Sequence, residues 1–184
     1  MSLFEYVSVA VSIVLAFGVT HLLRGLMFAS KREDRYWVHL SFVILLLLMH
    51  FQLWWGFWDA SAVDKWTFFL FVLALLGPVI LYMLAAILVP AEKPTNWITH
   101  FEENRVRFYI GSAGYIAWAM TLRVVLLDAP LFQTYSWFQL AGVLVLLFAS
   151  YEPTKYKDRV TVFSVYAIAF SQALYRLNAD GTIS

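Results

Sequence analysis

Long, uninterrupted apolar runs dominate this chain, and short polar segments separate them. Residues 42–49 and 68–76 are apolar at every position. They lack the alternation of apolar and polar side chains that is typical of a barrel strand with one face toward lipid. Backbone groups in lipid must satisfy their own hydrogen bonds, so such runs predict helices that cross a bilayer. The pattern indicates an all-α membrane protein.

The apolar runs divide into about six transmembrane helices, because a bilayer core about 30 Å thick takes about 20 mainly apolar residues per helix. We expect these helices to form one compact bundle, so that residues 1–184 make a single transmembrane domain. The expected helices cover Leu3–Met27, Tyr36–Trp58, Trp66–Val89, Arg107–Leu127, Leu131–Tyr151 and Val160–Leu177.

The longest polar connection between these helices runs from Pro90 to Asn104. It mixes Trp97 and Phe101 with acidic side chains, and Thr99 is a residue type that can cap a helix. We expect a short amphipathic helix here, lying on the membrane surface.

The composition agrees with a membrane location. Hydrophobic residues make up 62% of the chain and charged residues 14%, whereas soluble domains carry about 25% charged residues. The absence of cysteine excludes disulfides and thiolate metal sites. A net charge of +1 gives no reason to expect a nucleic-acid partner.

The positions of the basic residues predict the orientation in the membrane. Ten of the 13 Lys and Arg residues flank the first, third and fifth connections, and only Lys65, Arg123 and Arg176 lie at the other helix ends. Cytoplasmic connections retain Lys and Arg, so both termini should lie away from the cytoplasm. The compact chain without sorting signals suggests the bacterial inner (plasma) membrane.

Polar residues at mid-membrane depth are candidates for an ion or substrate pathway, because a bilayer disfavours them unless they have a function or a partner. His50 and Gln52 lie in the second expected helix, and Pro78 interrupts the third at a similar depth. Pro78 should kink its helix and free the carbonyl of Ala74, which could face His50. Arg123 completes the candidate pathway. The alternative is that the kink and the histidine only support packing.

His21 and His39 form a second candidate site, because antiparallel neighbouring helices would bring them to one level. Two imidazoles at one level could clamp a haem iron. The alternative is that both histidines hydrogen-bond carbonyls of nearby connections. No metal-binding motif accompanies them, so haem is a cofactor hypothesis and no metal site is predicted.

Charged residues at the non-basic helix ends predict structural ion pairs. Arg123 has apolar neighbours and should pair with Asp59 or Asp128, and Arg176 should pair with Glu5. The alternative interpretation of these charges is a channel mouth that selects anionic solutes.

These features favour an oligomeric channel or a transporter of small solutes or ions. The alternatives are a haem- or cofactor-binding redox subunit and an assembly subunit that binds other membrane proteins. We find no catalytic motif and predict no catalytic residue. The expected partners are lipid and either further copies of the chain or other membrane proteins.

Overall fold

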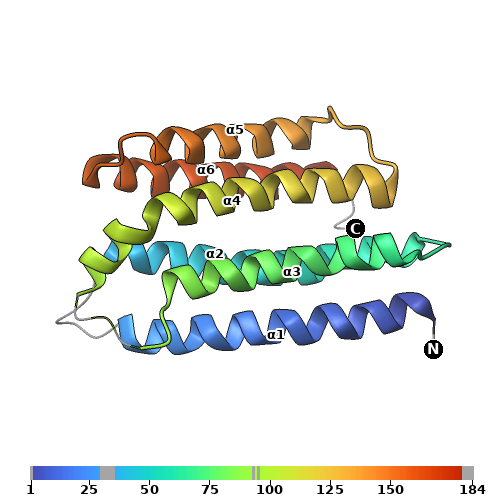
Figure 1. Cartoon of the computed structure of the whole chain (residues 1–184). Coiled ribbons are helices and arrows are strands. Elements are labelled where there is room, and N and C mark those ends of the chain that lie inside the picture. Colours follow the sequence, from blue (N-terminus) through green and yellow to red (C-terminus); the bar gives the residue numbers. More distant parts are fainter. Residues whose placement is uncertain (1, 30–35, 93, 95, 180–184) are drawn as a thin grey trace.

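Figure 1 shows the computed structural model of the chain, in which six long helices lie roughly side by side. The structure describes residues 2–29, 36–92, 94 and 96–179, apart from the side chains of Ala29, Tyr135 and residues 174–179. All regular structure in these ranges is helical, which confirms the predicted all-α class. The helices are α1 (Leu3–Ala29), α2 (Trp37–Gly56), the 3-10 helix η1 (Phe57–Ala62), α3 (Phe68–Leu88), α4 (Trp97–Leu127), α5 (Thr134–Ser150) and α6 (Lys155–Ala179).

The helices form two groups of three in chain order. In the first group α1 packs against α2 and α3, and in the second α5 packs against α4 and α6. Contacts of α3 with α4, and of α2 with α6, join the two groups. Helix α1 begins and α6 ends toward the same end of the bundle (Figure 1).

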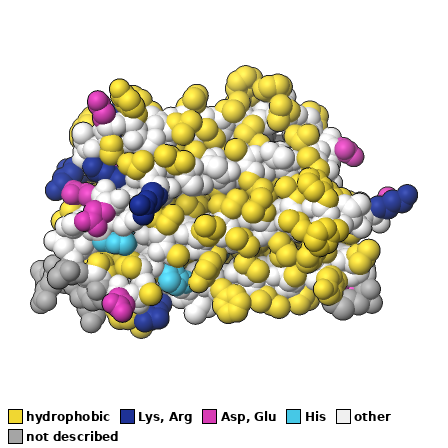
Figure 2. Space-filling view, viewed as in Figure 1, with side chains coloured by type: hydrophobic (Ala, Val, Ile, Leu, Met, Phe, Trp, Pro, Cys, Tyr) yellow, Lys and Arg dark blue, Asp and Glu magenta, His cyan; other side chains and the backbone are white. Residues whose placement is uncertain are grey.

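We call the other end of the bundle, where the chain passes from α1 to α2, from α3 to α4 and from α5 to α6, the basic end. Lys and Arg side chains gather there in Figure 2, together with acidic and histidine side chains, while hydrophobic side chains cover most of the remaining face. This separation fits the predicted orientation, in which the basic end faces the cytoplasm.

Among the described residues, four helices are long and apolar enough to cross a membrane: α1, α2 with η1, α3 and α4. Only 22% to 33% of the most apolar part of each is buried against the rest of the chain. The remaining apolar surface suits lipid. Helix α5 has 17 residues, fewer than a typical span, and α6 begins with four charged residues in five positions. Six spans therefore remain a prediction.

Helix α4 corrects the predicted connection before it. It begins at Trp97, ten residues before the predicted Arg107, because Asn96 rather than Thr99 caps it. The Asn96 side-chain oxygen accepts hydrogen bonds from the backbone N–H groups of Ile98 at 2.8 Å and Thr99 at 3.4 Å. The predicted separate surface helix was wrong. Its residues are the first turns of α4, which lie at an angle to the rest (Figure 1).

The other predicted boundaries shift by a few residues. Helix α2 ends at Gly56 rather than Trp58, and α5 covers a shorter range than Leu131–Tyr151. Helix α6 begins at Lys155 instead of Val160, and the Thr154 hydroxyl accepts a 3.3 Å hydrogen bond from the backbone N–H of Lys157 in its first turn. The charged residues of this turn are therefore helical.

Candidate functional site

A cavity of about 490 Å³ lies between α2 with η1 on one side and α4, α5 and α6 on the other. Its volume falls within the range of roughly 300–1,000 Å³ that is typical of small-molecule sites. Most of its wall is apolar, with Leu48, Ile116 and Ala169 among the lining residues. The amide and charged side chains in the wall are Gln52, Asp59, Arg123, Gln139 and Gln172. Tyr115 and Tyr166 also line it, and the Tyr166 hydroxyl donates to Ser41 O.

Gln139 of α5 is the most informative of these side chains. It is only 8% exposed, and its Oε1 atom has no hydrogen-bond partner among the described residues. A buried acceptor without a partner costs about 1–3 kcal/mol. Because Gln139 lines the cavity, a molecule bound there is a candidate source of the missing donor.

Two predicted pathway residues, Gln52 and Arg123, line this cavity, and so does Asp59, the predicted partner of Arg123. The Arg123 guanidinium donates a 3.3 Å hydrogen bond from Nη2 to Gln133 Oε1. Asp128 ends α4 in a left-handed conformation, with φ 47°. The pairing of Arg123 with Asp59 or Asp128 stays a prediction.

The other two predicted pathway residues face different neighbours. His50 donates a 2.7 Å hydrogen bond from Nδ1 to Leu46 O in its own helix, and its ring lies against Gly18 of α1. Neither His50 nor Pro78 lines the cavity between α2 and α4–α6. The four residues predicted to form one pathway therefore lie in different parts of the bundle: Gln52 and Arg123 line the cavity, whereas His50 and Pro78 do not.

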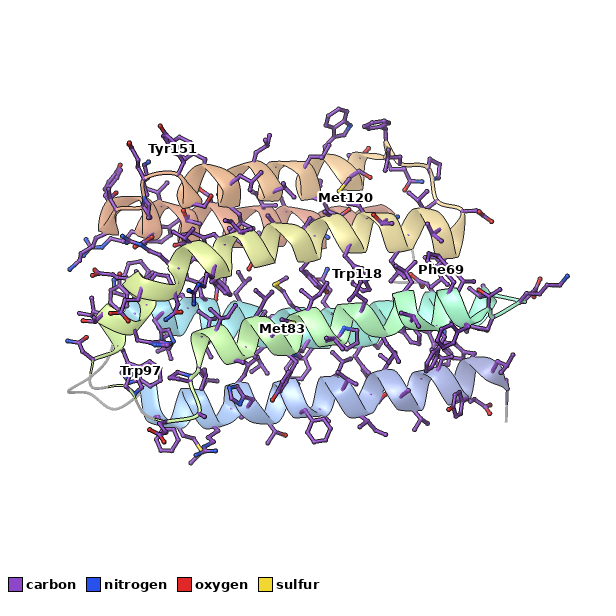
Figure 3. The ribbon with its side chains drawn as sticks, in the orientation of Figure 1. Phe69, Met83, Trp97, Trp118, Met120 and Tyr151 are labelled. Atoms are coloured by element: carbon purple, nitrogen blue, oxygen red, sulfur yellow. The ribbon has the colours of Figure 1, made fainter. Side chains whose placement is uncertain are left out.

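Trp118 of α4 occupies the region beside Pro78. Its indole covers Gly77 so closely that a β-carbon there would have no room. Its Nε1–H donates a 3.0 Å hydrogen bond to Leu73 O, one residue before the Ala74 carbonyl that the proline deprives of its helical donor. Figure 3 shows Trp118 between α4 and α3. The Trp118 side chain therefore occupies the space beside Gly77 and Pro78 where the predicted kink could have left room for an ion.

The two histidines of the second predicted site donate hydrogen bonds to carbonyl groups at the carboxy-terminal end of α3 and so cap this helix. His21 of α1 donates from Nε2 to Val89 O at 2.6 Å, and His39 of α2 donates to Leu88 O at 2.8 Å. His100 of α4 adds a 3.1 Å bond to Ile87 O. Three helices thus satisfy three consecutive carbonyls that a helix end leaves without partners.

This geometry supports the alternative in which the histidines bond carbonyls rather than the haem clamp. The Nε2 atoms of His21 and His39 both point at backbone oxygens, so coordination through them requires breaking two hydrogen bonds. Within the described ranges, no group of three His, Asp or Glu side chains could hold a metal ion.

A buried ion pair at the basic end was missed by the sequence analysis. Asp158 of α6 is fully buried, and its Oδ2 accepts a 2.6 Å hydrogen bond from Arg105 Nη1. Its Oδ1 accepts a 2.9 Å bond from the Tyr109 hydroxyl. Burial raises the pKa of nearby Tyr36, and the carboxylates of Asp158 and Glu102 raise it further. The hydrogen bonds of Asp158 to Arg105 and Tyr109 link α6 to α4.

Glu5 has a local role at the start of α1. Its Oε2 accepts a 2.9 Å hydrogen bond from Ser2 N, and the Ser2 hydroxyl accepts a 3.2 Å bond from Glu5 N. This is a capping box, whose Ser-x-x-Glu pattern was visible in the sequence. The side chain of Arg176, its predicted partner, lies outside the described residues.

Comparison with protein-family models, with curated proteins and with solved structures found no match to this chain.

Proposed function

We propose that the protein is a membrane carrier that binds a small solute in the cavity between α2 and α4–α6. The observation that carries this proposal is the unpartnered Gln139 oxygen in the mainly apolar wall of the cavity. Preformed sites commonly combine an apolar lining with a few polar groups that orient the ligand.

Packing toward the basic end favours a carrier over an open pore within one chain. Phe42 lies about one helical turn before Leu45 of the cavity wall, and its ring packs against Phe101, Phe108 and Tyr109 with centroids 5.3 to 5.7 Å apart. All four rings are at least 97% buried. Solute passage through this layer requires the helices to move, as they do in a carrier.

Single cysteines can test the proposal directly, since the natural chain contains none. Ala119→Cys places a thiol in the cavity wall, and Ala86→Cys places one on an exposed position of α3 that should face lipid. Each variant is treated with a membrane-impermeant maleimide in vesicles of both orientations. Lys65→Cys and Lys155→Cys mark the two ends of the bundle.

A carrier predicts that Ala119→Cys reacts quickly from the side marked by Lys65→Cys, and measurably but more slowly from the other side. Ala86→Cys should stay unlabelled from both sides. Equal rates from both sides would indicate a pore, and reaction from one side alone would indicate a static binding site. Either result overturns the proposal.

A further inference from the structure

The amide and charged side chains of the cavity lie toward the end away from the basic end. Gln52 lies four residues before the end of α2, and Arg123 lies four residues before the end of α4, both about 6 Å from those ends. Gln139 is five residues into α5, or about 8 Å. The amide and charged groups therefore form a rim at one depth.

The apolar wall continues well below this rim. Leu45 lies 11 residues before the end of α2, and Ile116 lies 11 residues before the end of α4. These separations place them about 16–18 Å from the helix ends. The cavity thus extends about 10 Å beyond these amide and charged groups, and the Tyr166 hydroxyl in this deeper part already donates to Ser41 O. A molecule that fits it has a polar head at the rim and an apolar chain beneath.

The rim also limits the charge of the head group. Asp59 contributes a carboxylate and Arg123 a guanidinium, so their formal charges balance. Arg123 is held by Gln133. The buried Oε1 of Gln139 can only accept a hydrogen bond. A head group that carries a donor and no net charge satisfies this acceptor without adding an unbalanced charge to an apolar site.

We infer that the cavity binds an uncharged, single-chain amphiphile whose head group carries hydroxyls, with one hydroxyl donating to Gln139 Oε1. The inference rests on the same cavity as the proposed carrier, but it concerns binding alone and makes no claim about movement across the membrane.

The test measures retention of three probes of equal chain length by the protein in nanodiscs, using native mass spectrometry. The probes are a monoacylglycerol, the corresponding fatty acid and the corresponding alkylamine. The wild-type chain should retain the monoacylglycerol in preference to both charged probes. Gln139→Leu should weaken its retention about tenfold. Leu144→Ala, at a 67% exposed position of the same helix, should leave it unchanged.

A second variant covers the case in which Gln139→Leu does not fold. Ala119→Phe fills the cavity from α4 without altering the amide, and it should abolish retention. The inference is overturned if all three probes bind equally, if the fatty acid binds best, or if none is retained. Retention of the monoacylglycerol without two-sided cysteine labelling would support this inference and contradict the carrier, so the two failures are distinguishable.

Discussion

Gly18 of α1 lies against the imidazole of His50 in α2, with no space for a β-carbon between them. Close approach of this kind is typical of membrane helices, where small residues allow backbones to pack tightly. The contact fixes the surroundings of the only histidine near the middle of the bundle among the described residues. His50 Nε2 is buried there without a hydrogen-bond partner.

Gly18→Ala should destabilise the bundle by about 1–3 kcal/mol, because the added methyl group must displace the imidazole. Thermal unfolding in detergent measures the loss. Gly114→Ala is the matched control, since a β-carbon there meets nothing within 4 Å. His50→Ala should recover part of the stability in the Gly18→Ala background. Equal effects of the two glycine substitutions would contradict the tight contact.

Replacing one member of the buried pair Arg105–Asp158 should be costly. Asp158→Asn or Arg105→Gln alone leaves an uncompensated buried charge, with an expected loss of about 3–5 kcal/mol. The double variant should lose clearly less than the sum of the two, which a double-mutant cycle measures. Additive losses would show that the pair does not act as a unit.

The ion pair between Lys155 and Glu102 provides the control for that experiment. Its atoms lie 3.1 Å apart, but the lysine side chain is 65% exposed. Exposed pairs contribute about 0–1 kcal/mol. Lys155→Gln should therefore change the unfolding temperature little.

His39→Leu should destabilise the protein by about 1–3 kcal/mol, because it leaves the buried Leu88 carbonyl without a donor. His39→Gln should retain part of that stability, since its amide can donate. His100→Leu should cost less, because His100 is only partly buried and water can replace it. Thermal unfolding ranks the three variants by stability. A larger loss for His100→Leu than for His39→Leu would contradict the role of His39 as the buried donor to Leu88 O.

Hydrophobic pattern alone predicted the helical class and five of the helix positions to within a few residues. It failed at the start of α4, where polar and charged residues interrupt the apolar pattern between Trp97 and Arg107. This segment is helical because Asn96 caps it and its residues contact other helices, as His100 does with α3. Such tertiary contacts leave little trace in a hydropathy pattern.

Part of the candidate site was predictable from the sequence. Gln52 and Arg123 attracted attention because polar side chains are rare in apolar segments, and both line the cavity. Gln139 lies in a segment that begins with polar residues, so it did not stand out. The grouping of Asp158 with Arg105 joins residues 53 positions apart, and no local spacing could reveal it.

The cap on α3 can be completed only late in the synthesis of the chain. Its donors come from α1, α2 and α4, which lie both before and after the capped helix in the chain. A ribosome releases the amino-terminal part first, so α3 is complete before His100 has been added. A nascent chain ending before α4 holds two of the three donors. The third donor, His100 of α4, can bond to Ile87 O only after the segment that follows α3 has been made.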